Sequence, residues 1–307
     1  MTILNKTLIT ITGATASSKT SLAAHLAKDL EGEILSADSR QVYRRMNLGT
    51  GKDYKDYMVD GVKIPVHLID LVDAGYKYNV YEFQRDFRSA YDDIMNRGKQ
   101  AILCGGTGMY IDAVLNGYKL INVPVNNDLR SELEQKEMDE LIALLESKKK
   151  LHNVSDTSTR KRLIRALEIA EFYEEHPNED ISFPKIDSVI FGVKFDRQSR
   201  RKRITGRLKE RLKEGMVEEV ECLLKSGITA EQLIFYGLEY KYLTQYVTGD
   251  IYYNDMFQRL NTAIHQFAKR QMTWFRRMEK QGTKIHWLDG YMPMEEKLEK
   301  IKSVLQC

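Results

Sequence analysis

The sequence predicts an α/β fold: a doubly wound parallel sheet with an inserted helical segment and a helical C-terminal part. Two observations lead to this prediction. Short apolar runs alternate with helical patterns through the first part of the chain, and the first run, Leu8 to Thr12, ends in a loop of small residues that opens a helix. We expect an α/β core over 1–126, a helical insertion over 127–180, and a return strand with the helical remainder of the core over 181–307.

The loop after the first strand has the pattern of a phosphate-binding loop. A strand that ends at glycine and continues as a helix behind Lys-Thr directs backbone N–H groups at one point, where two or three phosphates fit. Lys19 adds positive charge there, and Thr20 supplies a hydroxyl for Mg²⁺. The expected core is therefore P-loop NTPase-like. The predicted diphosphate- or nucleotide-binding residues of the loop are Gly13, Ala14, Thr15, Ala16, Ser17, Ser18, Lys19 and Thr20.

Hydrophobic spacing places the other elements in order. Leu22, Leu26 and Leu30 share one face of a helix over 20–30, and Asn79 with Glu82 is typical of a helix N-cap. The further expected strands are 33–37, 65–72, 101–104, 187–195 and 284–288. The further expected helices are 128–150, 157–175, 199–225, 230–245, 294–305 and 255–280, the last with Leu260, Ile264, Phe267, Phe275 and Met278 as its buried stripe.

Composition excludes several classes of protein. No run reaches the ~18 apolar residues of a membrane span, and the N-terminus has no signal-peptide pattern, so we expect a cytoplasmic protein without a membrane partner. Three separated cysteines form neither a disulfide framework nor a metal-binding spacing. The net charge is only +3, but 200–213 holds eight basic residues against Glu210. Such a run is either a solvated helix face or a surface for phosphates, and composition leaves both open.

Further blocks follow the loop in a fixed order. They are Ser36-Ala37-Asp38-Ser39-Arg40-Gln41-Val42-Tyr43-Arg44, Gly49-Thr50-Gly51-Lys52, His67-Leu68-Ile69-Asp70, Gly105-Gly106-Thr107-Gly108-Met109-Tyr110, Arg162 to Glu168, Arg203-Ile204 with Arg207, and Ala268-Lys269-Arg270-Gln271 with Trp274-Phe275-Arg276. Over nearly its whole length the chain resembles the tRNA dimethylallyltransferase family, also called tRNA isopentenyltransferase. It departs from the family pattern at Ala14, Ser18, Asp53 and Tyr236-Gly237-Leu238-Glu239-Tyr240.

The resemblance implies transfer of a dimethylallyl group from dimethylallyl diphosphate to the exocyclic amine of the adenosine 3′ to the anticodon, with release of diphosphate. Asp38 matches the family's general base, and Arg207 matches its catalytic arginine. Arg203 lies one turn away on the same helix face and is expected to bind the diphosphate. Thr107 and Thr20 complete the implied catalytic group, and Mg²⁺ on Thr20 is the implied cofactor.

The implied partner is the anticodon stem-loop of tRNA, with the enzyme acting as a monomer. The target base has to leave the stack to reach such a pocket. Asp38, Ser39, Arg40, Gln41 and Thr107 are expected to hold the flipped adenine and its neighbours. The expected contacts to the rest of the tRNA are Leu129, Arg130, Arg160, Lys161, Arg162, Arg165, Lys269 and Arg270, and the segment 127–180 would serve this contact.

Two other functions fit parts of the sequence. A small-molecule kinase would use the same loop to hold ATP, but a basic surface of a size suited to tRNA would then have no use. A non-catalytic RNA-binding relative with a decayed loop would account for Ser18 in place of glycine.

Overall fold

The computed structural model describes residues 7–148, 156–176 and 183–306. The chain divides into two compact units, the first made of 1–118 and 184–307 and the second of 119–183. The expected insertion, 127–180, lies within the second unit, and its C-terminal limit falls outside the described residues.

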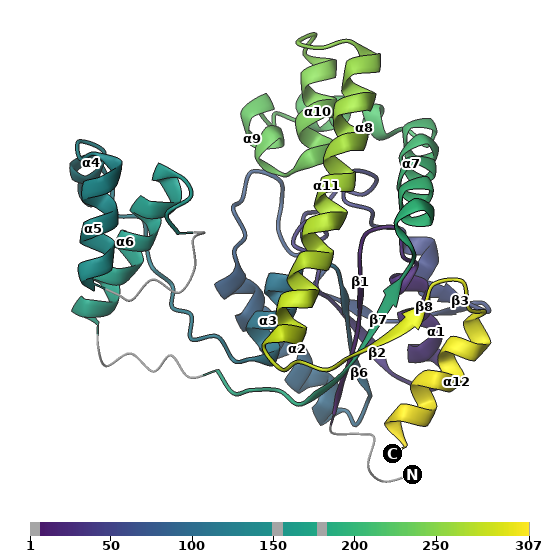
Figure 1. The fold of residues 1–307 in the computed structure, drawn as a ribbon. Coiled ribbons are helices and arrows are strands. Elements are labelled where there is room, and N and C mark those ends of the chain that lie inside the picture. The colour runs from purple at the N-terminus through teal and green to yellow at the C-terminus, as the bar shows by residue number, and fades with distance from the viewer. Residues whose placement is uncertain (1–6, 149–155, 177–182, 307) are drawn as a thin grey trace. The chain divides into compact units, whose positions relative to one another are not determined.

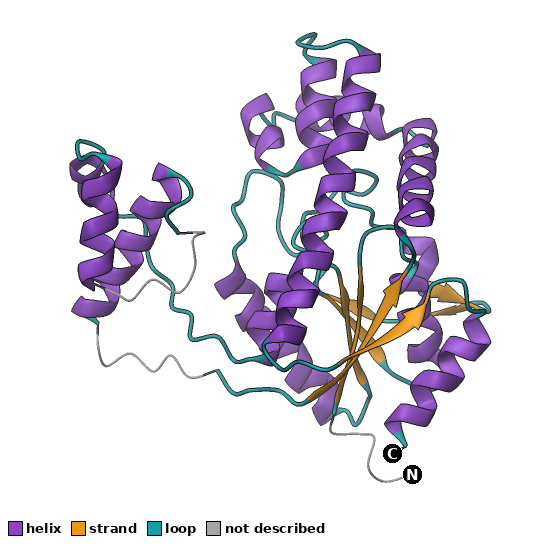
Figure 2. Cartoon of the chain, viewed as in Figure 1, coloured by secondary structure: helices purple, strands orange, loops and turns teal. Residues whose placement is uncertain are grey.

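A six-stranded sheet forms the centre of the first unit (Figure 1, Figure 2). All of its neighbouring strands pair in parallel, in the order β5-β2-β6-β1-β7-β8. The strands are β1 (Leu8–Gly13), β2 (Glu33–Ser36), β5 (Val66–His67), β6 (Ala101–Gly105), β7 (Ser188–Lys194) and β8 (Ile285–Asp289). This arrangement confirms the predicted doubly wound α/β fold, and it brings the carboxyl ends of the strands to one edge.

Helices cover both faces of this sheet. On one face α1 (Lys19–Asp29) packs over β1, and α12 (Met294–Leu305) packs beside α1, with Leu22, Leu26 and Ile301 in one buried cluster. On the other face lie α2 (Val80–Asn96) and α3 (Gly108–Leu115) (Figure 1). The predicted cap of α2 is present, because Asn79 accepts the N–H of Glu82 and Glu82 accepts the N–H of Asn79.

The expected strand over 65–72 is mostly wrong. Only Val66–His67 pairs with β2, because Leu68 and Asp70 take positive φ angles of 64° and 54° that interrupt an extended backbone. Before it, a short 3-10 helix, η2 (Tyr54–Tyr57), leads into a two-stranded antiparallel hairpin of β3 (Met58–Val59) and β4 (Val62–Lys63).

Helices also stand beyond the carboxyl edge of the sheet. The expected helix 199–225 is two helices, α7 (Arg197–Lys213) and α8 (Met216–Lys225), because Gly215 between them has φ 103°. The expected helix 230–245 is also two, α9 (Ala230–Phe235) and α10 (Leu238–Val247), divided at Gly237. The long helix α11 (Tyr253–Lys280) packs on α10, α7 and α3.

The second unit is a small helical bundle with its own core. It contains α4 (Asn127–Leu133), α5 (Met138–Lys148) and α6 (Arg160–Glu175), so the expected helix 128–150 is two helices. Arg160 of α6 donates hydrogen bonds to carbonyl oxygens between α4 and α5, which fixes this break. The core is formed by Leu133, Leu141, Leu145, Leu163, Ile164, Ala166, Leu167 and Ala170.

Candidate active site

Three loops meet at the carboxyl edge of the sheet, after β1, β2 and β6. The Thr107 N–H donates to the Ala37 carbonyl over 3.2 Å, and the Ser39 N–H donates to the Thr107 hydroxyl over 3.1 Å. A Cβ at Gly105 would collide with the backbone of Ala37, so only glycine allows this approach. The loop after β6 therefore fixes the backbone on which Asp38 stands.

The loop after β1 leads directly into α1, which begins at Lys19. Ser18 has φ 61° in the left-handed region, which explains why glycine is usual in the loop pattern. Arg203 fastens the loop: its Nε donates to the Ala16 carbonyl over 2.8 Å and its Nη2 to the Ser18 hydroxyl over 2.7 Å. The Arg203 guanidinium also lies 4.5 Å from the ring centre of Phe195.

Gln271 of α11 joins two of the loops. Its Oε1 accepts the Thr15 N–H over 2.9 Å, and its Nε2 donates to the Gly106 carbonyl over 2.9 Å. The residue is only 8% exposed, so both amide atoms have their partners inside the protein. Gln271 ends the sequence block Ala268-Lys269-Arg270-Gln271. No role was predicted for it, because its partners are more than 160 positions away in sequence.

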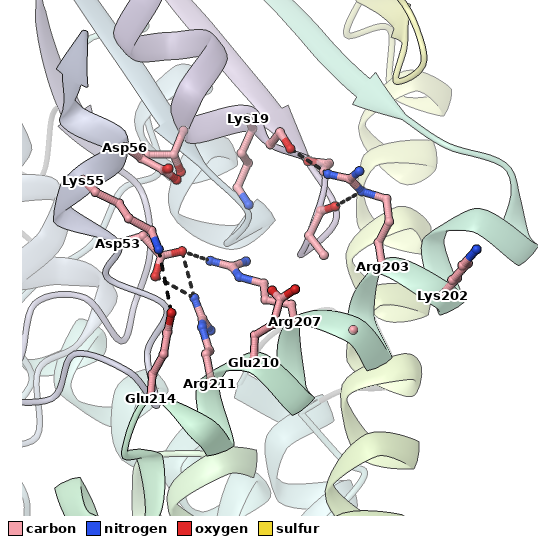
Figure 3. A pocket seen from close by; sticks show the side chains of 15 residues that line it. Lys19, Asp53, Lys55, Asp56, Lys202, Arg203, Arg207, Glu210, Arg211 and Glu214 are labelled. Atoms are coloured by element: carbon pink, nitrogen blue, oxygen red, sulfur yellow. Dashed lines mark hydrogen bonds and ion pairs between the residues drawn. The ribbon is translucent and has the colours of Figure 1, made fainter.

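A cavity of about 500 Å³ opens beside the phosphate loop (Figure 3). Its floor includes Lys19 and Thr20, and its far wall is α7 with Arg203, Arg207 and Arg211. Figure 3 shows the Lys19 side chain pointing into this space. Burial lowers the pKa of Lys19, which means that the buried ammonium lacks a sufficient counter-charge and favours binding of an anion.

Asp53 faces the same cavity and contacts two arginines (Figure 3). Its carboxylate accepts from Arg207 over 2.6 Å and from Arg211 over 3.1 Å. Burial alone would raise the pKa of Asp53, but the positive charges of Arg211 and Arg207 lower it below the usual value. In the sequence, Asp53 stood out only as a departure from the family pattern, and Arg211 was not predicted. The i, i+4 spacing of Arg203, Arg207 and Arg211 was the available signal.

A second cavity, of about 300 Å³, lies on the other side of Lys19, Thr20, Arg207 and Arg211, which line both spaces. It contains Asp38, the predicted general base, together with Thr107. It also has apolar and aromatic walls. These walls are formed by Tyr57, Cys104, Tyr236, Leu238, Ile264 and Phe267.

The three residues after Asp38 all line this second cavity, but their side chains have different partners. The Asp38 Oδ1 accepts the Arg40 N–H over 3.0 Å. Arg40 extends toward Phe235, with its guanidinium 5.8 Å from the ring centre. The Gln41 side chain is buried and bonded to Ser36 and to the Gly51 carbonyl, so it already has protein partners. Ser39 lines the cavity as well.

Two other residues at the second cavity differ from the sequence-based expectations. Phe267 was expected in the buried stripe of α11, but it is 39% exposed and lines the cavity, with Arg270 5.9 Å from its ring centre. Glu239 also lines this cavity, and burial raises the pKa of its carboxyl group. Lys269 and Arg270 are exposed on α11.

Several predicted tRNA-contacting residues of the second unit have structural partners there. Glu168, which is buried, accepts from Arg130 over 2.9 Å and also pairs with Arg165. Arg165 further donates to the Val123 carbonyl over 2.7 Å, and Arg160 binds carbonyl groups as described above. Lys161 and Arg162 are exposed, and Leu129 packs at the edge of the bundle core. A role of all six in tRNA contact stays a prediction.

Among the described residues, no helix combines the length and apolar composition of a bilayer span. Within the same residues, no group of three or more His, Cys, Asp or Glu side chains could hold a metal ion. The oxygen of Thr20 on the floor of the larger cavity suits Mg²⁺ that takes its other ligands from a diphosphate and water.

The fold and the site together define a class: a P-loop-like α/β protein with a cavity lined by lysine and arginine beside a pocket that contains a carboxylate. Comparison with known proteins gives the family. The family described as IPP transferase matches residues 41–278, and the chain belongs to it. It is 60% identical to tRNA dimethylallyltransferase 2 of Phocaeicola vulgatus, over 97% of both chains, and 56% identical to the protein of that name in Bacteroides fragilis, over 100% of this chain and 99% of that one.

Solved structures have the same fold. A full-length tRNA isopentenylpyrophosphate transferase from Bacillus halodurans superposes with a TM-score of 0.72 at 29% identity, covering 98% of this chain and 96% of that one. A eukaryotic dimethylallyltransferase described as acting on tRNA has a TM-score of 0.74, over 93% of this chain and 74% of that one. At 23% identity this second likeness concerns the fold alone.

Proposed function

We propose that this protein transfers a dimethylallyl group from dimethylallyl diphosphate to the exocyclic amine of the adenosine 3′ to the anticodon of tRNA, releasing diphosphate. One observation supports it above the others. The anion-binding groups Lys19, Thr20 and Arg207 form the partition between a polar cavity and a pocket that holds a carboxylate and apolar walls. A donor with a charged head and a short hydrocarbon tail needs this combination.

The donor is proposed to lie across that partition. Its diphosphate meets the loop N–H groups, the Lys19 ammonium and the Arg207 guanidinium, since these groups stabilise the charge that grows as the carbon–oxygen bond breaks. Its five-carbon tail extends into the second cavity against Tyr57 and Ile264. Magnesium, held by the Thr20 hydroxyl and phosphate oxygens, would neutralise charge on the leaving group.

Asp38 is proposed as the general base. As the adenine amine forms its new nitrogen–carbon bond, its proton passes to the Asp38 carboxylate, while the electrons of the broken carbon–oxygen bond leave with the diphosphate. The bond from the Arg40 N–H to Oδ1 fixes the carboxylate, and the hydroxyl of Thr107 holds the next residue in place. The site is therefore organised before a substrate enters.

The tRNA is proposed to meet the mouth of the second cavity. Two arginine–aromatic pairs lie there, Arg40 with Phe235 and Arg270 with Phe267. In such pairs the ring can stack on an unstacked base and the guanidinium can bind a phosphate. Lys269, Lys161 and Arg162 are proposed as phosphate contacts, since all three are exposed. The helical unit 119–183 is proposed as the further tRNA-binding part, and the enzyme is proposed to act as a monomer.

The test is incubation of the purified protein with anticodon stem-loop RNA, Mg²⁺ and either dimethylallyl diphosphate or ATP. We expect a prenylated adenosine with the first donor and no label transfer from the terminal phosphate of ATP. Asp38→Asn is the matched control, because it removes the charge and keeps the shape. Phosphate transfer from ATP without prenylation would identify a kinase, and tight RNA binding without turnover would identify a binding protein; either result would refute the proposal.

A further inference from the structure

The carboxylate of Asp53 occupies an unusual place, inside the anion-binding cavity itself. It lies opposite Lys19 in Figure 3 and pairs with Arg207 and Arg211, with its side chain only 20% exposed. Arg207 is the residue expected to meet the leaving diphosphate. The cavity therefore already contains an anion, the Asp53 carboxylate, that pairs with an arginine expected to bind the substrate.

The charges around this cavity make the contact significant. Lys19, Arg207 and Arg211 line the same partly buried cavity, and of its acidic groups Asp53 is the one paired directly with both arginines. The Asp53 carboxylate is ionised at neutral pH, because Arg211 and Arg207 keep its pKa low. Arg207 and Arg211 are thus held in a fixed orientation while the cavity contains no substrate, and less side-chain entropy is lost when an anion binds.

A bound diphosphate and Asp53 would act on the same guanidinium groups. Each arginine has several N–H donors, so the two anions can share it, but they repel each other over a few ångströms in a medium less polar than water. The carboxylate therefore helps to orient the arginines and at the same time weakens the grip on the anion.

We propose that Asp53 is a positioning residue that holds Arg207 and Arg211 at the wall between the two cavities and promotes release of the pyrophosphate product. This inference rests on the proposed function, because it takes pyrophosphate as the product. Because the two anions share the arginines, the ion pairs with Asp53 persist when pyrophosphate leaves. The arginines then keep the orientation seen in the structure.

Calorimetric titration with inorganic pyrophosphate and Mg²⁺ tests the inference without tRNA. We expect Asp53→Asn, and independently Asp53→Ala, to bind pyrophosphate about tenfold more tightly than the wild type. Asp56→Asn is the matched control, since Asp56 lines the same cavity and, within the described part of the chain, has no ion pair with either arginine. Its affinity should change by less than about threefold.

Kinetics supply a second readout that a structural role would not change in this direction. In Asp53→Asn, KM for the prenyl donor and steady-state kcat should both fall, and a burst of product should precede a slower steady state. Unchanged or weaker pyrophosphate binding, or equal tightening in Asp56→Asn, would overturn the inference. Failure of the proposed function is distinguishable, because the wild type would then show no prenylation of RNA whatever the behaviour of Asp53.

Discussion

Ser18 provides the sharpest test of how the phosphate loop is built. Its φ of 61° lies in the left-handed region, where a residue with a Cβ is strained by about 1 kcal/mol. Glycine removes this strain, but it also raises the entropy of the unfolded chain by an amount equivalent to about 0.4–1 kcal/mol. These two contributions nearly cancel, so backbone conformation changes the unfolding free energy of Ser18→Gly by close to zero.

The remaining contribution is the hydrogen bond from Arg203 to the Ser18 hydroxyl. A bond of this kind at the rim of a cavity contributes about 0.5–1 kcal/mol. We therefore expect Ser18→Gly to destabilise the fold by less than about 1 kcal/mol, because the Arg203 bond to the Ala16 carbonyl persists. Ser18→Ala keeps the strain and loses the bond, and Ser18→Val adds the larger penalty of a β-branched residue at positive φ, about 2 kcal/mol or more in total.

Thermal unfolding and pyrophosphate titration measure the series. About 1 kcal/mol corresponds to a shift in Tm of about 2–4 °C for a unit of this size. The expected order of stability is wild type first, then glycine and alanine about equal, then valine, with pyrophosphate affinity kept in the glycine variant. If valine proves as stable as alanine, or if the glycine and alanine variants differ by clearly more than about 1 kcal/mol, the balance of strain and entropy assigned to position 18 is wrong.

Substitutions at three further positions test other parts of the site and the sheet. Asp38→Ala should lower the single-turnover prenylation rate about 100-fold or more while RNA affinity in a filter-binding assay stays within a few fold; an unchanged rate would remove Asp38 from the mechanism. Gln271→Glu should weaken pyrophosphate binding at least tenfold by titration, because it loses the bond to Gly106 and adds a negative charge beside the loop, whereas Gln271→Met should lose less. Glu33→Gln should cost about 1–3 kcal/mol in denaturant unfolding at pH 7, since hydrogen bonding to Arg97 lowers the pKa of Glu33 to about 2. A carboxylate whose pKa is lowered by folding stabilises the folded state at pH values above its unfolded pKa. The difference in unfolding free energy between wild type and Glu33→Gln should therefore shrink as the pH falls from about 4.5 to 2. A difference that is constant with pH would contradict the assignment.

The order of strands and helices was predictable because local patterns carry it. Apolar runs end at small residues, and Asn79 with Glu82 marks a helix start that the structure confirms. Breaks between elements were predicted less well. Gly215 and Gly237 each divide an expected helix, and the helical pattern continues on both sides of them, so periodicity alone does not reveal the division.

The phosphate loop was predictable for a different reason, since eight consecutive residues carry the whole pattern. The contacts that hold it were not, because they come from distant elements. Thr15 is bonded to Gln271 and Ala16 to Arg203, at separations of 256 and 187 positions. A single sequence gives no register between such segments, and the family resemblance named the blocks without pairing them.

The three arginines of α7 illustrate how geometry changes the meaning of a charge run. The sequence was compatible with either a solvated helix face or a surface for phosphates, and spacing placed only Arg203 and Arg207 on one face. In the fold that face lines the cavity beside the loop, where Arg203 binds loop oxygens and the other two bind Asp53. Arg203 is bonded to the loop, whereas Arg207 and Arg211 are paired with the carboxylate of Asp53. A diphosphate can therefore recruit Arg207 and Arg211 without loosening the loop that binds it.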